Sequence, residues 1–149
     1  MRRFTELDDA LEQLAKDMEI CDRVFVYGTL QKGHSNHSLL STSDRLGITQ
    51  TMEPFVLGDI GFPYAFLRTK VPEKYNHLLF PVKGEVYKMD GLHTFEGLDM
   101  LEGYPSHYNR RMVTTKLGVP AWMYMQDDWG TAEYCSACHL KEGVWQWAK

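Results

Sequence analysis

The sequence lacks any apolar run approaching the roughly 18–20 residues that a membrane-spanning helix requires. Cysteine is scarce, and the odd number of three argues against a disulfide framework and favours a reducing, cytoplasmic location. There is no excess of positive charge, because the formal net charge is −4 and charges of both signs are scattered. We therefore expect neither a membrane span nor a nucleic-acid partner. Acidic residues interrupt residues 1–18 after two arginines, so no signal peptide is predicted.

The sequence does contain enough apolar side chain for one globular core. Of its 149 residues, 44% are hydrophobic and 13% aromatic, which is typical of a folded chain. A chain of this length fits one domain, and it shows no internal repeat, low-complexity segment or linker. We divide it into a helical extension over residues 1–22 and a domain over residues 23–149.

Helical periodicity is clearest in two places. Residues 4–19 are predicted to form an amphipathic helix with Thr5 as its N-cap. The apolar face of this helix consists of Leu7, Leu11, Leu14 and Met18. A second helix is expected within residues 91–103, capped by Thr94 and ended by Gly103.

Most of the remaining chain has the character of strands. The predicted strands cover residues 23–30, 45–52, 54–60, 64–69, 82–89, 110–117 and 121–126, and a short helix runs from Ser35 or Asn36 to Leu40. In the strand over 82–89, Val82, Gly84 and Val86 are expected to face inward and their charged neighbours outward. This order is typical of an α+β fold, with helices against a mostly antiparallel sheet or barrel.

The predicted second helix turns a carboxylate toward its own apolar side. At about 100° of rotation per residue, Glu102 lies about 40° from Leu98, between Leu98 and Phe95, and Leu101 lies about 60° to the other side. A carboxylate buried without a partner is costly, so its pKa is expected to rise into the range that general acid–base catalysis uses. The structural alternative is an ion pair with an arginine of the segment 110–111, or a hydrogen bond to a backbone group.

A glycine turn follows the first predicted strand. Glycine at position 28 permits positive φ and the close approach of a ligand to the backbone. The successive N–H groups of Gly28, Thr29 and Leu30 are able to hold an anion if they point into one concavity. The alternative is an ordinary turn that ends a strand.

A nucleotide is a poor candidate for the ligand of this turn. The stretch from Gly28 to Ser35 nearly matches the phosphate-binding pattern Gly-x-x-x-x-Gly-Lys-Ser/Thr, but His34 stands in place of the lysine. The stretch "FVLGD" (55–59) only loosely resembles the strand that accompanies such loops. We expect His34 and His37 to form a surface pair beside the mouth of a pocket.

The stretch "CSACH" (135–139) formally matches a haem attachment site. Cys135, Cys138 and His139 also make a partial zinc set, to which Cys21 or His77 could add a fourth ligand. The simpler interpretation is a loop with two unpaired thiols, and we expect no metal and no cofactor.

Four pieces of the sequence together indicate a family. They are "VFVYGTLQKGHSNHSLL", "TMEPFVLGDIGFPYAFL", "VKGEVYKMDG" and "LDMLEGYPSHYNRRMV", and in order and spacing they cover residues 24–113. With them the sequence resembles the γ-glutamylcyclotransferase-like family, most closely its γ-glutamylamine cyclotransferase branch.

The resemblance implies a small mixed β-barrel with flanking helices and an enzyme that needs no cofactor. Its implied substrate is a γ-glutamyl amide, whose α-amine attacks the γ-carbonyl to release 5-oxoproline and a free amine. The substrate-binding residues it implies are Tyr27, Gly28, Thr29, Leu30 and Tyr108, with Glu102 as the proton acceptor.

Some questions stay open at the level of sequence. The chain could be a non-catalytic module that binds γ-glutamyl groups or small anions, because a fold can persist after its chemistry is lost. The identity of the leaving amine is not specified by these residues. The extension of about 22 residues before the YGTL turn is unusual for the family, and it could cover an open barrel end or form the seam of a homodimer.

Overall fold

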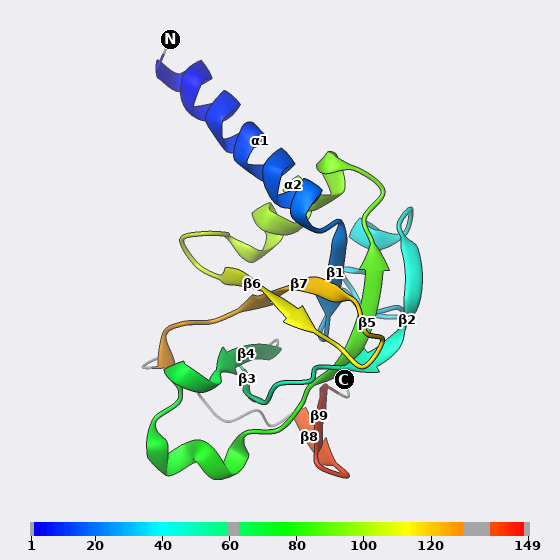
Figure 1. Cartoon of the computed structure of the whole chain (residues 1–149), viewed down its shortest axis with the longest axis vertical. Helices are drawn as coiled ribbons and strands as arrows, with labels where there is room; N and C mark the ends of the chain where they lie inside the picture. Colours follow the sequence, from blue (N-terminus) through cyan, green and yellow to red (C-terminus); the bar gives the residue numbers. More distant parts are fainter. Residues whose placement is uncertain (1, 60–62, 130–137, 148–149) are drawn as a thin grey trace.

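The protein is described here by a computed structural model, which covers residues 2–59, 63–129 and 138–147 (Figure 1). Within these residues the chain forms two α-helices, α1 (Arg2–Ile20) and α2 (Leu92–Glu102), and nine strands. The strands are β1 (Arg23–Val26), β2 (Asp44–Gln50), β3 (Phe55–Asp59), β4 (Pro63–Leu67), β5 (Lys83–Lys88), β6 (Asn109–Thr114), β7 (Pro120–Met125), β8 (Cys138–Lys141) and β9 (Val144–Trp147). Three short 3₁₀ helices are η1 (His37–Leu40), η2 (Arg68–Lys70) and η3 (Glu73–Leu78). None of the helices in this part of the chain has the length and apolar character needed to cross a bilayer.

The strands form one mixed sheet and two hairpins. The five-stranded sheet has the order β2-β5-β1-β7-β6, in which β1 runs parallel to β7 and the other pairs are antiparallel. Isolated bridges join the two hairpins β3–β4 and β8–β9 to this sheet. Phe66 of β4 pairs with Gln126, which follows β7, and Trp145 of β9 pairs with Val82, which precedes β5. The expected α+β architecture is confirmed, although in the described residues the strands meet through these bridges rather than through one continuous ladder.

Strand β1 is covered on both faces, which explains its unbroken apolar run. Because side chains alternate along a strand, Val24 and Val26 face one side and Phe25 the other. The first side packs on Phe95 and Leu98 of α2, in a cluster that also includes residues of α1 and β7. The second side packs against the β3–β4 and β8–β9 hairpins. Both α-helices lie on the same side of the sheet, and the N-terminal end of α1 projects beyond it (Figure 1).

The helix predictions are confirmed in position but not at their N-termini. Helix α1 begins at Arg2, so Thr5 lies inside it rather than at its cap. Helix α2 begins at Leu92 after Gly91, so Thr94 is not the cap, and its hydroxyl instead donates to the Asp90 carboxylate. The end of α2 is as predicted, because Gly103 has a left-handed φ of 66° that glycine adopts without steric cost. On the predicted apolar face of α1, Leu14 is buried and Met18 half-buried, but Leu11 is exposed; the Leu7 side chain lies outside the described residues.

The strand predictions differ from the structure mainly near the C-terminus. The strand predicted over 23–30 ends at Val26, because the chain then turns away at Tyr27–Leu30. The hairpin β8–β9 was not predicted, because its few residues show no regular alternation that separates them from a loop. Residue 60, the end of the strand predicted over 54–60, and Cys135 of "CSACH" lie outside the described residues, as do the side chains of Cys138 and His139.

Gly84 permits the close pairing that places β1 in the sheet. A Cβ atom added at this position would lie 2.3 Å from the carbonyl oxygen of Val26 and 2.7 Å from the ring of Phe25. Both atoms belong to β1, which pairs with β5 through Val26 and Glu85. Any side chain at position 84 would therefore push β1, and the turn that follows it, away from β5.

We predict that Gly84→Ala lowers the free energy of unfolding by about 1–3 kcal/mol or more, because overpacking forces backbone shifts. The matched control is Gly97→Ala in α2, where the nearest atom to an added Cβ is 3.8 Å away. That change should raise the free energy of unfolding by about 0.5–1 kcal/mol, since alanine is the better helix former. Urea titrations followed by circular dichroism measure both values, and equal stability of the two variants would contradict the packing described.

Candidate active site

Helix α2 delivers Glu102 to the end of β1. Glu102 is the last residue of α2, and the left-handed Gly103 ends the helix immediately after it. The predicted direction of Leu98 toward the core is confirmed, since Leu98 is fully buried. The expectation for Leu101 is wrong, because 44% of this residue is exposed. The apolar side of α2 is therefore narrower than the sequence predicts, and Glu102 lies at its edge, half-buried.

Glu102 and the YGTL turn line one small cavity. Its volume is about 40 Å³, which is room for about three water molecules at roughly 10–15 Å³ each. The residues that line it are Phe25, Val26, Tyr27, Gly28, Thr29, Leu30, Pro63, Glu102 and Tyr124. Five of the six predicted site residues are thus brought together from two separate parts of the chain; the sixth, Tyr108, lies nearby.

The environment of Glu102 is poorly hydrated and offers no countercharge. Burial raises the pKa of Glu102 from 4.5 to about 7. Within the described residues its carboxylate makes no hydrogen bond or ion pair. Its position at the C-terminal end of a helix, where the helix dipole is negative, further disfavours the ionised form. At neutral pH such a carboxyl group exists in both protonation states, which is the condition for moving a proton in either direction.

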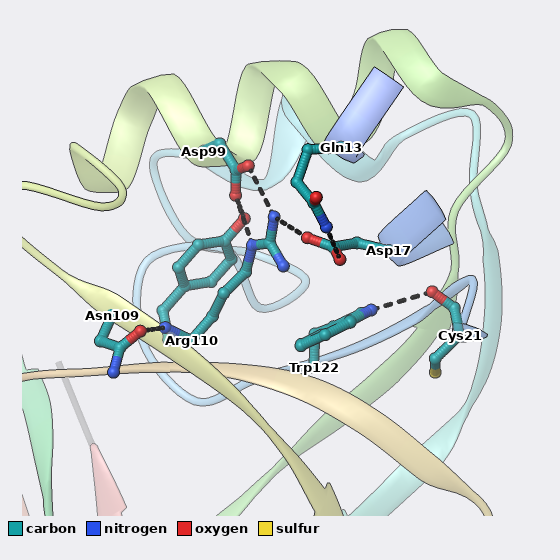
Figure 2. Close-up of polar contacts among 8 residues, drawn as sticks. Gln13, Asp17, Cys21, Asp99, Asn109, Arg110 and Trp122 are labelled. Carbon is teal, nitrogen blue, oxygen red and sulfur yellow. Dashed lines mark hydrogen bonds and ion pairs between the residues drawn. The ribbon is translucent and has the colours of Figure 1, made fainter. Parts of the chain in front are cut away.

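The ion pair proposed as an alternative for Glu102 is absent because Arg110 is engaged elsewhere. The Nε and Nη2 atoms of Arg110 donate to the two carboxylate oxygens of Asp99 at 2.9 and 3.1 Å. Nη2 also lies 3.0 Å from an Asp17 carboxylate oxygen on α1 (Figure 2). Arg111 is exposed and has no ion pair among the described residues.

The YGTL turn keeps its amide groups available. Among the described residues, the N–H groups of Gly28, Thr29 and Leu30 donate no hydrogen bond to another protein group. The carbonyl groups of Gly28 and Thr29, in contrast, accept from the N–H groups of Gln31 (3.1 Å) and Asn36 (2.9 Å). Three unpaired donors beside a cavity form a site that an anionic oxygen can occupy.

The reason for glycine at position 28 differs from the one expected. Gly28 does not adopt positive φ. Instead, a Cβ atom at this position would lie 2.9 Å from Cγ of Pro63, the first residue of β4. The small residue is needed because the pyrrolidine ring packs directly against the turn.

The two predicted tyrosines have different positions. The Tyr27 hydroxyl donates to the carbonyl of Tyr124 at 2.8 Å and accepts from the N–H of Ala65 at 2.9 Å, so it ties β1 to β7 and β4. Tyr108 is buried immediately before β6, and burial followed by the nearby Glu102 carboxylate raises its pKa. Tyr108 therefore lies near enough to Glu102 to be affected by its charge, while the hydroxyl of Tyr27 is used in hydrogen bonds that hold the fold together.

Glu85 is a site residue that the sequence analysis missed. It was expected to face solvent, but it is buried and holds the start of the loop after the YGTL turn. Its carboxylate accepts from the N–H of Lys32 (2.8 Å), the hydroxyl of Tyr87 (2.9 Å) and Nη2 of Arg45 (2.8 Å). Burial opposes ionisation, but these hydrogen bonds together hold the pKa of Glu85 below its usual value. One feature of the sequence could have indicated this: in the "GEVY" piece, Glu85 stands between Gly84 and Val86, the two positions expected to face inward.

The two histidines of the loop pack against the fold. Nδ1 of His37 is 3.0 Å from the carbonyl oxygen of Leu30, and its ring lies 5.6 Å from that of Tyr87. The His34 ring lies 5.0 Å from that of Trp147 in β9. A nucleotide-binding loop needs a strand, a glycine loop and a helix in succession. Here the turn leads only into the four-residue 3₁₀ helix η1, and the "FVLGD" strand, β3, forms an antiparallel hairpin with β4. In the described residues, no three side chains of the kinds that ligate metals are grouped together.

Comparisons with known proteins agree with the fold and with the family that the sequence resembles. Residues 24–146 match the family described as "Gamma-glutamyl cyclotransferase, AIG2-like". A candidate gamma-glutamylcyclotransferase of Vibrio cholerae is 39% identical over 105 residues, which cover 70% of this chain and 82% of that protein. A candidate gamma-glutamylcyclotransferase of Drosophila melanogaster is 32% identical over 124 residues, with 75% and 74% covered. The crystal structure of an AIG2-like protein from Mus musculus superposes with a TM-score of 0.60 at 26% identity, covering 76% of this chain and 85% of that one.

We predict that Glu85→Gln lowers the free energy of unfolding at pH 7 by about 1–3 kcal/mol, because hydrogen bonds to a charged group are lost. The pKa of Glu85 is lowered in the folded protein, so its stabilisation is fully present above the unfolded value near 4.5 and is lost as the pH falls through the folded value. The difference between variant and wild type should therefore shrink in acid. Urea titrations at pH 7 and pH 3.5 test this, with Glu53→Gln, an exposed acid, as the control.

Proposed function

This chain belongs to the gamma-glutamyl cyclotransferase, AIG2-like family, and we propose that it is an enzyme that cyclises a γ-glutamyl amide into 5-oxoproline and a free amine. The observation that supports this most directly is the shared cavity. It is lined both by a carboxyl group with a pKa of about 7, Glu102, and by Gly28, Thr29 and Leu30, whose N–H groups have no acceptor among the residues that the structure describes. This reaction needs two kinds of group from the protein, a proton acceptor and hydrogen-bond donors that bind an anionic oxygen.

The proton steps fall to Glu102. The α-amine of a γ-glutamyl amide is largely protonated at neutral pH, with an ordinary pKa of about 8, and cannot attack in that form. The Glu102 carboxylate takes one proton from it, and the amine nitrogen then forms a bond to the γ-carbon. When the bond from the γ-carbon to the leaving nitrogen breaks, Glu102 returns the proton to that nitrogen. The ring nitrogen then still carries one proton too many, and the same carboxylate passes this second proton to the departing amine, which leaves as an ammonium ion. Atoms and charge balance without water, a metal or a cofactor, and such proton transfer contributes about 10²–10⁴-fold to the rate.

The YGTL turn stabilises the charge that moves to oxygen. As the ring closes, the γ-carbonyl oxygen becomes an oxyanion, and the N–H groups of Gly28, Thr29 and Leu30 are placed to donate to it or to the substrate carboxylate. The loss of one such donor typically costs about 3 kcal/mol of transition-state stabilisation. Because the nucleophile belongs to the substrate, holding its chain in a bent, near-attack conformation supplies a further part of the rate enhancement. The buried ring of Tyr108 would form part of the wall that holds it.

The substrates that we propose are γ-glutamylamines, in accordance with the branch that the sequence resembles. A screen of γ-glutamyl amides that includes γ-glutamyl-lysine, simple γ-glutamyl alkylamines and glutathione, with 5-oxoproline as the measured product, identifies the leaving amine. If 5-oxoproline binds in a calorimeter but no amide is turned over, the chain is a binding module rather than an enzyme.

We predict that Glu102→Gln reduces kcat by about 10²–10⁴-fold, because the amide side chain cannot accept the proton. The control is Glu96→Gln, which removes the same charge from an exposed position of the same helix and should leave kcat unchanged. Both variants are assayed for 5-oxoproline after their circular dichroism spectra have been matched to that of the wild type. Turnover of the Glu102 variant at the wild-type rate would refute the role of Glu102.

We predict that kcat/KM rises with pH and levels off above an apparent pKa of about 7, because the base must be ionised in the free enzyme. The same shift has a consequence for stability. Since the folded pKa of Glu102 is raised above 4.5, the folded state binds more protons between these values, and its stability falls as the pH rises from about 4.5 to 7. Glu102→Gln should therefore melt at a higher temperature than the wild type at pH 8 but not at pH 4. A rate that does not vary between pH 5.5 and 8 would contradict the assignment.

A further inference from the structure

Arg110 is the centre of a buried cluster, Asp17–Arg110–Asp99, that joins three elements of the fold (Figure 2). Its side chain on β6 is only 2% exposed. The guanidinium group lies over the rings of Phe95, Tyr104 and Trp122 at 4.4, 4.1 and 4.7 Å. These rings leave the edge of the guanidinium plane for hydrogen bonds, and that edge is occupied by Asp99 from α2 and Asp17 from α1.

The cluster is connected to the cavity through two short paths. Asp99 lies one turn before Glu102 on α2, so Arg110 holds the helix next to the proposed base. The hydroxyl of Tyr124 donates to the same Asp99 carboxylate, and Tyr124 lines the cavity and accepts from Tyr27 through its carbonyl group. A displacement of Asp99 would therefore move both the end of α2 and one wall of the cavity.

Asp17 comes from the part of the chain that precedes the family match, which begins at residue 24. It is buried, and its second oxygen accepts from Nε2 of Gln13 at 3.0 Å (Figure 2). Helix α1 is also fixed just beyond this point, because the carbonyl of Cys21 accepts from Nε1 of Trp122 at 2.9 Å. The Asp17 carboxylate is thus held by Gln13 of its own helix and by Arg110 of β6, and the chain just after α1 is held by Trp122 of β7.

We infer that Asp17 is a positioning residue for Glu102. Helix α1 is then needed for the geometry of the active site and is not a dispensable extension. The inference rests on the proposed function, in which Glu102 is the base. A guanidinium group has five N–H donors, and Asp99 alone leaves part of them unpaired in a buried place. Without Asp17, the free donors of Arg110 would bind water or another carboxylate. Glu102 is the next acid after Asp99 on helix α2. Asp17 takes an N–H of Nη2 that Asp99 does not use, which leaves Arg110 fewer donors to offer to Glu102 and thereby keeps Glu102 without a partner.

The test is Asp17→Asn, with Glu19→Gln as the control because Glu19 is an exposed acid of the same helix without an ion pair in the described part of the chain. The first measurement needs no substrate: a ¹³C NMR titration of side-chain carboxyl groups, in which the Glu102 signal is assigned by its loss in Glu102→Gln. In Asp17→Asn we expect the pKa of Glu102 to fall from about 7 by about one unit toward its ordinary value. The second measurement is turnover, for which we expect kcat to fall about tenfold with KM changed less than twofold, because the base is displaced while the turn is not.

The pKa of Glu102 separates this role from a purely structural one. If Asp17 only contributed to stability, Asp17→Asn would melt at a lower temperature but keep the wild-type titration and kcat at 25 °C, and the inference would be overturned. If Asp17→Asn fails to fold, Gln13→Leu, which leaves the carboxylate but removes its other partner, should shift the titration in the same direction by a smaller amount; an unchanged titration overturns the inference. If instead the wild type has no turnover while the titration responds to Asp17→Asn, the proposed function fails and the coupling between α1 and Glu102 stands.

Discussion

The site depends on an unequal distribution of buried charge between two carboxylates of one helix. Asp99 and Glu102 are three residues apart on α2, but Asp99 is paired with Arg110, and Glu102 has no partner in the described part of the chain. A buried guanidinium group attracts carboxylates, and the Nε and Nη2 atoms of Arg110 are taken by Asp99 and Asp17. In the role that we propose for Asp17, these two acids keep Arg110 from pairing with Glu102, whose burial raises its pKa.

In the YGTL turn, side chains and backbone groups have different roles. Side chains around it are engaged in holding its shape: the carboxylate of Glu85 fixes Lys32, His37 contacts the carbonyl of Leu30, and the phenol of Tyr27 joins three strands. The backbone amides of residues 28–30 have no acceptor in the described part of the chain, and in the proposed reaction they bind the substrate. A site built from main-chain donors on a rigid turn needs no reorganisation when charge develops, which is the physical basis of this kind of stabilisation.

Much of the fold was predictable because it follows from short-range patterns. The helical spacing of residues 4–19, the alternation in 82–89 and the glycine that ends α2 each identify an element, and the structure contains all three. The errors occur where a neighbour in space decides the outcome. Thr94 was taken for a cap, but α2 starts earlier and Thr94 donates to Asp90; Leu101 was placed in the core, but 44% of it is exposed.

The sequence by itself determined the types of the elements and the two halves of the candidate site, Glu102 and the YGTL turn, because periodicity and turn chemistry act over a few residues. It did not determine which acid of α2 takes Arg110, that Glu85 is buried, or that Asp17 reaches across to β6. Those outcomes depend on residues that are 11 to more than 90 positions apart in the chain and belong to different helices and strands. The pKa of Glu102 follows from which groups surround it and which are already paired, and only the tertiary structure decides this.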